Sequence, residues 1–191
     1  MPILSLDPKS TALVLVDLQN GITSRTPAPH LAADVISNAV RLADAFRARH
    51  ATVVLVRVAF SADGADRLAM PTDTPAPAMT PTPDWSDIVA ALGPKAGDLV
   101  ITKHQWGAFY GTELDLQLRR RGVRTIVIGG ISTNFGVEST ARDAFERAFA
   151  LVFAEDATAA MSAEAHAFAI ANIFPRLGLV RSTDDVLSAL V

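Results

Sequence analysis

The sequence has no cysteine among its 191 residues. This absence excludes disulfide bonds, thiolate metal sites and a cysteine nucleophile anywhere in the chain. The chain also lacks a large excess of either charge. It has 17 Lys and Arg and 20 Asp and Glu, which gives a net charge of −3. Since the basic residues are scattered, the charge pattern predicts neither a nucleic-acid partner nor a polybasic membrane patch.

Long hydrophobic runs are also missing, since none reaches the roughly 18 residues that a membrane span needs. The opening residues, MPILSLD, lack a basic segment followed by a long apolar one, so we expect no signal peptide. Half of the residues are hydrophobic and 19% are charged, which suits a packed core and argues against global disorder. We therefore expect a single domain over residues 1–191, located in the cytoplasm.

Apolar, β-branched runs alternate with helical patterns along the chain. The runs that we predict as buried strands are residues 12–16, 52–58, 99–102, 125–128 and 151–154. Amphipathic spacing, with capping signals and helix-spaced charges, predicts helices over residues 31–50, 112–121, 138–148, 162–173 and 184–190. Because alternating strands and helices pair in parallel through right-handed crossovers, the pattern predicts an α/β fold, a three-layer, doubly wound, Rossmann-like sandwich around a mostly parallel sheet.

The stretch 71–83 interrupts this alternation with five prolines. So many prolines exclude a helix or a central strand. One interpretation is an exposed, polyproline-like loop. The other is a stiff lid or a subunit-interface loop, because the stretch lies between the second and third strands on the side where ligands bind.

Chemically active side chains follow several of the predicted strands. In open α/β sheets, ligands bind beyond the carboxyl ends of the strands. Asp17 ends the first strand, Arg57 lies near the end of the second, and Lys103 ends the third. Asp17 follows an unbroken apolar run, and a buried carboxylate needs a partner. Lys103 occupies the equivalent position on another strand, so we predict that the two act together.

The fourth strand runs into a glycine-rich turn within residues 126–144, IVIGGISTNFGVESTARDA. A strand that passes through such a turn into a helix aims backbone N–H groups at one point, where they can hold an anion or a developing oxyanion. Gly136 stands where an attacking side chain would be expected, and we predict that a helix opens there. The chemistry is thereby limited to attack by water, proton transfer, or binding alone.

Other candidate residues have both structural and functional interpretations. Trp106 and Phe109, which follow Lys103, could be core, interface or substrate contacts. Arg57 could face a ligand or extend its charged end to solvent. The four histidines show no ligand spacing, and GGISTNFG is not the G-x-G-x-x-G dinucleotide fingerprint, so we predict no metal and no cofactor.

Four segments in order carry a resemblance to a known family. They are LVLVDLQNG (13–21), TKHQWGAFYGTELDLQLRRRGV (102–123), GGISTNFGVESTARDAFERAF (129–149) and AEDA (154–157). From about residue 11 onward, the chain resembles the isochorismatase-like (cysteine hydrolase) superfamily. The resemblance implies a six-stranded parallel sheet, a homo-oligomer (dimer or tetramer) and an Asp–Lys–Cys triad, whose positions here hold Asp17, Lys103 and Gly136. It also implies a cis peptide between Ile131 and Ser132, with an oxyanion hole formed by the N–H groups of Ser132 and Gly136.

The glycine at position 136 departs from most of that family. Nicotinamidase and carbamoylsarcosine amidase depend on the thiolate. Isochorismatases carry glycine there and cleave a vinyl ether without a covalent intermediate, with the Asp as general acid. In those enzymes the residues before the glycine are similar to Tyr-Ala-His, whereas this chain has Ser132, Thr133 and Asn134. The chain therefore resembles a third, Gly-bearing branch with amidase-like surroundings.

Three functional hypotheses follow. The first is a non-covalent hydrolase of a small, anionic metabolite, with Asp17 as general acid or base and a vinyl ether such as isochorismate as the best-motivated substrate class, ahead of amides or carbamoyl compounds. In this hypothesis the pocket is shaped by Gln19, Arg57, Trp106, Phe109 and Asn134. The second is a catalytically inactive, small-molecule-binding member of the same fold. The third is a structural subunit of an oligomer.

Overall fold

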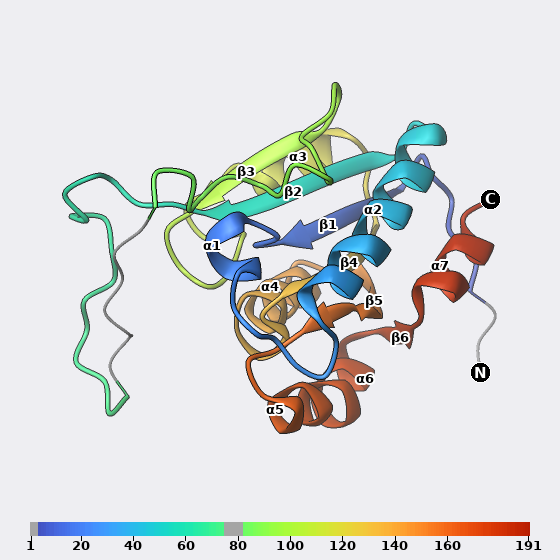
Figure 1. Cartoon of the computed structure of the whole chain (residues 1–191). Helices are drawn as coiled ribbons and strands as arrows, with labels where there is room; N and C mark the ends of the chain where they lie inside the picture. The colour runs from blue at the N-terminus through green and yellow to red at the C-terminus, as the bar shows by residue number, and fades with distance from the viewer. Residues whose placement is uncertain (1–3, 75–81) are drawn as a thin grey trace.

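The β-branched runs form one sheet of six parallel strands in the computed structural model, which describes residues 4–74 and 82–191. The strands are β1 (Thr11–Val16), β2 (Thr52–Val58), β3 (Leu99–Lys103), β4 (Thr125–Ile131), β5 (Ala150–Ala159) and β6 (Leu179–Arg181). Their order across the sheet is β3-β2-β1-β4-β5-β6, and every pairing is parallel. The predicted α/β fold with a six-stranded sheet is confirmed (Figure 1).

Helices cover both faces of the sheet because the central strands are apolar on both sides. On β1, Leu13 and Leu15 belong to one buried cluster, while Val14 and Val16 belong to the other, as the alternation of side chains in a strand requires. The first cluster includes residues of α2 (Ala32–Ala48) and α7 (Thr183–Ala189). The second includes residues of α3 (Leu114–Arg120), α4 (Glu138–Glu146) and α6 (Phe174–Leu177). In Figure 1, α2 crosses in front of the sheet and α3 lies behind it.

The strand order predicts a ligand site at the carboxyl ends of the two central strands. From β1 the chain moves outward to β2 and β3, then returns to add β4, β5 and β6 on the other side of β1. This reversal creates a crevice at the carboxyl ends of β1 and β4, which is where ligands bind in doubly wound sheets. Asp17 follows β1 and the glycine-rich turn follows β4, so the topology brings both to this crevice.

The helix after β4 begins earlier than the sequence predicts. A π-helical turn, η1 (Thr133–Val137), precedes α4. The carbonyl oxygen of Ser132 accepts hydrogen bonds from the N–H groups of Phe135 (3.2 Å) and Val137 (3.2 Å). Gly136 therefore lies inside this wide turn instead of at the start of the helix.

Several other boundaries differ from the predicted ones. The helix expected over residues 162–173 is α5 (Ala163–Phe168) followed by a second π-helical segment, η2 (Ala169–Ile173). A short helix, α1 (Asn20–Thr23), and the three-residue strand β6 were not predicted from the sequence. Both are too short to leave a periodic pattern.

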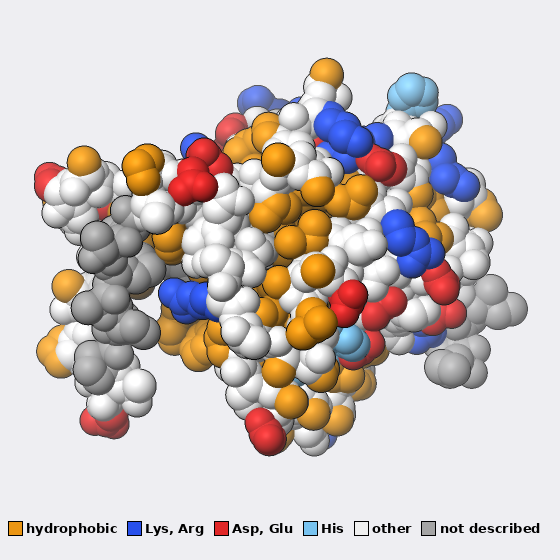
Figure 2. All heavy atoms as spheres, viewed as in Figure 1, with side chains coloured by type: hydrophobic (Ala, Val, Ile, Leu, Met, Phe, Trp, Pro, Cys, Tyr) orange, Lys and Arg blue, Asp and Glu red, His pale blue; other side chains and the backbone are white. Residues whose placement is uncertain are grey.

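The first part of the connection after β2 extends away from the body of the molecule (Figure 1), whereas Val89 and Leu92, nearer β3, are buried in the core. The core of the proline-rich stretch, residues 75–81, lies outside the described residues, so its role as a lid or interface loop stays a prediction. Within residues 4–74 and 82–191, none of the helices combines the length and the apolar character that a membrane span requires. Figure 2 shows Lys and Arg side chains interspersed with Asp and Glu on the viewed face.

Candidate active site

A buried ion pair joins the ends of two strands. Nζ of Lys103 donates to Oδ2 of Asp17 at 2.8 Å and to the carbonyl oxygen of Gln105 at 3.0 Å. The side chains of Lys103 and Asp17 are only 2% and 9% exposed. β3 pairs with β2 through Val58 and Lys103, and the N–H of Asp17 donates to Val56 of β2, so the sheet itself brings the two residues together, as the sequence predicts.

Asp17 has the properties of a proton-transfer group. Burial raises the pKa of its carboxyl to about 6, although Lys103 acts in the opposite direction. Oδ1 is buried and, within the described part of the chain, has no hydrogen-bond partner. The backbone is in the left-handed region, with φ of +55°, a conformation that costs a non-glycine residue about 1–3 kcal/mol. Asp17 thus combines a left-handed backbone with a half-satisfied carboxyl whose pKa is raised to about 6.

Gly136 faces this ion pair directly. A Cβ built on Gly136 would lie 3.0 Å from Oδ2 of Asp17 and 3.6 Å from Nζ of Lys103. The hydroxyl of Thr140 donates to the carbonyl of Gly136 at 2.6 Å and fixes the turn. The peptide bond between Ile131 and Ser132 is cis, at the position that the family resemblance implies.

A cavity of about 390 Å³ opens above these groups. Its lining consists of Asp17, Ile22, Arg25, Val58, Phe60, Arg67, Leu68, Trp85, Lys103, His104, Gln105, Trp106, Ile131, Ser132, Phe135, Gly136 and Met161. The predicted residues Asp17, Lys103, Ile131, Ser132, Gly136 and Trp106 are thus brought together around one space. A cavity of this size suits a small molecule.

Cations outnumber carboxylates around the cavity. Among the described residues of its lining, Asp17 is the one acidic side chain, and Lys103 pairs with it. Arg25 and Arg67 add positive charge. The guanidinium of Arg67 lies over the ring of Phe60, 4.7 Å from its centroid, which orients it by a cation–π contact. The balance of charge favours an anionic ligand.

Aromatic side chains form the walls of the mouth. Trp106 is 63% exposed and packs against Phe135 with ring centroids 4.9 Å apart. Trp85 lies so close to Gly21 that a Cβ there would be 2.0 Å from the indole ring. Glycine is therefore required in the DLQNG segment for Trp85 to take its place. Trp85, Arg25 and Arg67 were not predicted from the sequence, since they lie on loops and no local pattern marks them.

Gln19, Arg57, Phe109 and Asn134, expected to shape the pocket, do not line this cavity. The buried amide of Gln19 is satisfied by the backbone, because it bonds to the N–H and carbonyl of Val58 and to the carbonyl of Trp85. It therefore positions the wall instead of facing a ligand.

The other three are held elsewhere. Nε of Arg57 donates to Oγ1 of Thr102 on the neighbouring strand at 3.1 Å. Phe109 is 4% exposed and packs in the core, 6.0 Å from the ring of Phe149. The side-chain oxygen of Asn134 accepts from the hydroxyl of Ser132 at 3.4 Å. In each case the side chain contacts a neighbouring residue of the protein and does not line the cavity.

Three potential metal ligands meet away from this cavity. His30, Glu155 and His166 each offer one donor atom, and these atoms lie within 4.8 Å of one another. The hydrogen bond from His166, assisted by that of His30, lowers the pKa of the Glu155 carboxyl to about 2. We predicted no metal from the sequence because the histidines lack ligand spacing, and spacing along the chain cannot reveal a cluster assembled from three separate segments.

Comparisons with known proteins agree with this architecture. The Isochorismatase domain family matches residues 11–185. The "Uncharacterized isochorismatase family protein YecD" of Escherichia coli O157:H7 is 54% identical over 187 residues, which cover 98% of this chain and 100% of that protein. The structure of an isochorismatase family protein from Burkholderia thailandensis superimposes with a TM-score of 0.94 at 47% identity, covering 99% of both chains. Ureidoacrylate amidohydrolase RutB of Serratia proteamaculans is 32% identical over 207 residues, covering 96% of this chain and 84% of that protein.

The doubly wound fold, the buried site at its switch point and the match to these relatives together indicate a hydrolase. The chain belongs to the isochorismatase family.

Proposed function

We propose that this hydrolase cleaves a small, anionic vinyl ether by proton transfer and water attack, without a covalent intermediate. The observation that carries the proposal is the state of Asp17, which lines the cavity with a buried carboxyl whose pKa is about 6 and whose Oδ1 has no partner among the described residues. Gly136 supplies no nucleophile, and the chain has no cysteine to replace it. Proton transfer is therefore the chemistry that the side chains around Asp17 can perform.

The reaction uses one proton and one water. Protonated Asp17 donates to the terminal carbon of the enol ether, which leaves an oxocarbenium ion at the ether carbon. Water adds to that carbon and returns a proton to Asp17, and the resulting hemiketal breaks its C–O bond to release an alcohol and a ketone. A general acid of this kind contributes about 10²–10⁴-fold in rate.

The remaining groups would bind and orient the substrate. The N–H groups of Ser132 and Gly136 would hold a negative oxygen of the substrate, each donor contributing roughly 3–4 kcal/mol in a dry site. Lys103 positions Asp17 through the 2.8 Å ion pair. Arg67, held over Phe60, would attract a carboxylate at the mouth, while Trp106 and Phe135 would cover the apolar part of the substrate.

The test is turnover of a vinyl ether dicarboxylate, measured as release of the 2-keto acid. Asp17→Asn should lose at least about 10²-fold in kcat, whereas Asp34→Asn, at an exposed position on α2, should behave as wild type. Unchanged turnover in Asp17→Asn would contradict the mechanism. Hydrolysis of amide or carbamoyl compounds in place of the vinyl ether would instead favour an amidohydrolase activity, of the kind for which RutB is named.

Binding without turnover is the second candidate function, favoured by the missing nucleophile at Gly136. Both tryptophans of the chain, Trp85 and Trp106, line the cavity. Intrinsic fluorescence therefore reports occupancy independently of catalysis. Saturable quenching by a ligand class that yields no product would establish a binding protein on a hydrolase scaffold.

We also propose that the protein is located in the cytoplasm and forms a homo-oligomer, a dimer or tetramer. The first rests on the lack of cysteine, which is typical of a protein indifferent to its redox environment, and the second on the family resemblance. Light scattering of the purified chain would measure the number of subunits.

A further inference from the structure

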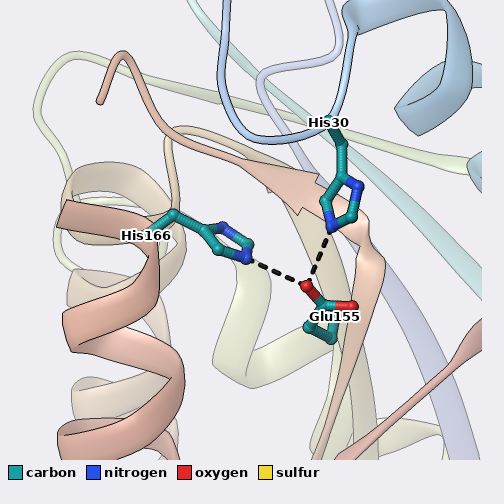
Figure 3. Close-up of side chains that lie close together, drawn as sticks. All are labelled: His30, Glu155 and His166. Carbon is teal, nitrogen blue, oxygen red and sulfur yellow. Dashed lines mark hydrogen bonds and ion pairs between the residues drawn. The ribbon is translucent and has the colours of Figure 1, made fainter. Parts of the chain in front are cut away.

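A second group of polar side chains lies outside the cavity, at the edge of β5 (Figure 3). Nε2 of His30 lies 2.8 Å from Oε1 of Glu155, and Nε2 of His166 lies 3.1 Å from the same oxygen. Figure 3 shows both rings directing this nitrogen toward one carboxylate oxygen, from the loop before α2 and from α5. Three donor atoms from three segments thus converge on one point.

The backbone around the cluster is fixed on each side. Ala28, two residues before His30, forms two hydrogen bonds with Ala160 at the end of β5, of 2.7 and 2.9 Å. The helix that carries His166 is capped by Ser162, whose hydroxyl accepts from the N–H of Ala165. Glu155 lies within β5 itself. The cluster is therefore built on ordered backbone, which lowers the cost of gathering the ligands.

The donor set is chemically specific. Two imidazole nitrogens and one carboxylate oxygen are a ligand set that proteins use for Zn²⁺ and related divalent ions. Such an ion lies about 2.0–2.1 Å from each donor, which places tetrahedral donors roughly 3.3 Å apart. The N–O separations of 2.8 and 3.1 Å are close to this value, and the two imidazole nitrogens lie within 4.8 Å of each other. An ion between the three donors requires the Glu155 carboxylate to turn away from the hydrogen-bonded position.

The second nitrogen of His166 has a partner of the expected kind. Nδ1 of His166 lies 2.9 Å from Oγ1 of Thr133. A histidine that ligates through Nε2 carries its proton on Nδ1 and donates it to a neighbouring oxygen, which orients the ring. His166 is 3% exposed, whereas the side chains of His30 and Glu155 are 29% and 33% exposed. The site therefore has a rigid inner ligand and a path from solvent.

We propose that Nε2 of His30, Oε1 of Glu155 and Nε2 of His166 bind one divalent transition-metal ion of the Zn²⁺ type, with water in the fourth position. The ion would join the loop before α2, β5 and α5. Through Thr133 it would also steady the η1 turn that carries Gly136. Its role is structural, because none of the three ligands lines the cavity.

The experiment is titration of chelator-treated full-length protein with ZnCl₂, followed by calorimetry and thermal unfolding, and with CoCl₂, followed by visible absorption. We expect one ion per chain, a Co²⁺ spectrum typical of a tetrahedral N/O site, and a rise in Tm of about 5–10 °C at about 100 times Kd. Glu155→Gln and His30→Asn should each weaken binding at least about 100-fold, and Thr133→Val should weaken it about 10–100-fold.

His50→Asn is the matched control. His50 is exposed at the end of α2 with φ of +55°, a conformation that asparagine tolerates, so this variant removes an imidazole without touching the cluster. Absence of saturable binding at one ion per chain in the wild type would overturn the proposal. So would a Zn²⁺ affinity equal to that of the wild type in folded His30→Asn, or an equal loss of affinity in His50→Asn.

Discussion

Oδ2 of Asp17 lies 3.0 Å from the position that a Cβ on Gly136 would take. The family's attacking side chain would therefore stand in contact with the carboxylate and 3.6 Å, at its Cβ, from Nζ of Lys103. The Asp–Lys pair, to which the family resemblance assigns the activation of a nucleophile, thus faces a position without a side chain. Proton transfer from Asp17 can operate in the same space, because a substrate atom or water can take the place of the missing side chain.

Gly136→Cys should yield an unusually reactive thiol. Asp17 can accept the thiol proton, and the Lys103 ammonium favours the thiolate. The thiol would be the only one in the chain, so its alkylation by iodoacetamide can be followed by mass. We expect a rate at about pH 7 at least about 10-fold above that of Ser37→Cys, at an exposed position on α2. Equal rates in the two folded variants would contradict an intact triad geometry.

Activity should fall as the pH rises through about 6. As a general acid, Asp17 must be protonated, and burial raises its pKa to about 6. The profile of log kcat/KM against pH should therefore decline with a slope near about −1 above that value. Steady-state rates between about pH 4.5 and 8.5 measure this limb. A limb that rises through pH 6 would assign Asp17 as a general base and would exclude the vinyl ether mechanism.

Lys103→Met should destabilise the protein in a pH-dependent way. The variant leaves the Asp17 carboxylate buried without its cation, which costs about 3–5 kcal/mol when the carboxylate is ionised. Burial raises the pKa of Asp17 in the folded chain to about 6, above its ordinary value in the unfolded chain. The protonated carboxyl therefore adds to the free energy of unfolding in full below about pH 4, and this contribution is lost as the pH rises through about 6. Urea denaturation should show a larger loss at about pH 8 than at about pH 5. An equal loss at both values would contradict the ion pair.

Arg67→Met should weaken substrate binding more than catalysis. The variant keeps an apolar stem over Phe60 and removes the charge that would attract a carboxylate at the mouth. We expect KM for an anionic substrate to rise about 10-fold while kcat changes less than about threefold. Lys9→Met, at an exposed turn before β1, serves as the charge-matched control. A fall in kcat with an unchanged KM would place Arg67 in the chemical step.

Asp98→Ala should destabilise the link between α2 and the start of β3. Its carboxylate accepts two hydrogen bonds from Arg47, of 2.7 and 3.1 Å, and its side chain is 2% exposed. Removing it leaves the guanidinium of Arg47 without its buried partner, at a cost of about 3–5 kcal/mol. Asp44→Ala removes the exposed partner of the same arginine and should cost under about 1 kcal/mol. Chemical denaturation of both variants measures the free energy of unfolding that each ion pair of Arg47 contributes.

The sequence by itself determined the class of fold. Runs rich in apolar residues, such as residues 12–16 and 125–128, can be buried on both faces, and amphipathic helices between them require parallel pairing. Asp17 and Lys103 were predictable from the same pattern, since each comes directly after an apolar run in the sequence. The absence of cysteine excluded a thiol nucleophile on composition alone.

Only the tertiary structure decided which side chains surround the site. Whether Trp85 or Arg67 lines the same cavity as Asp17 depends on the path of long loops, for which no periodic pattern exists. Gln19 and Phe109 follow strands as Asp17 and Lys103 do, yet their neighbours bind them into the wall and the core. The cluster of His30, Glu155 and His166 spans more than a hundred residues of sequence, because contacts between separate segments form only when the sheet and helices have packed.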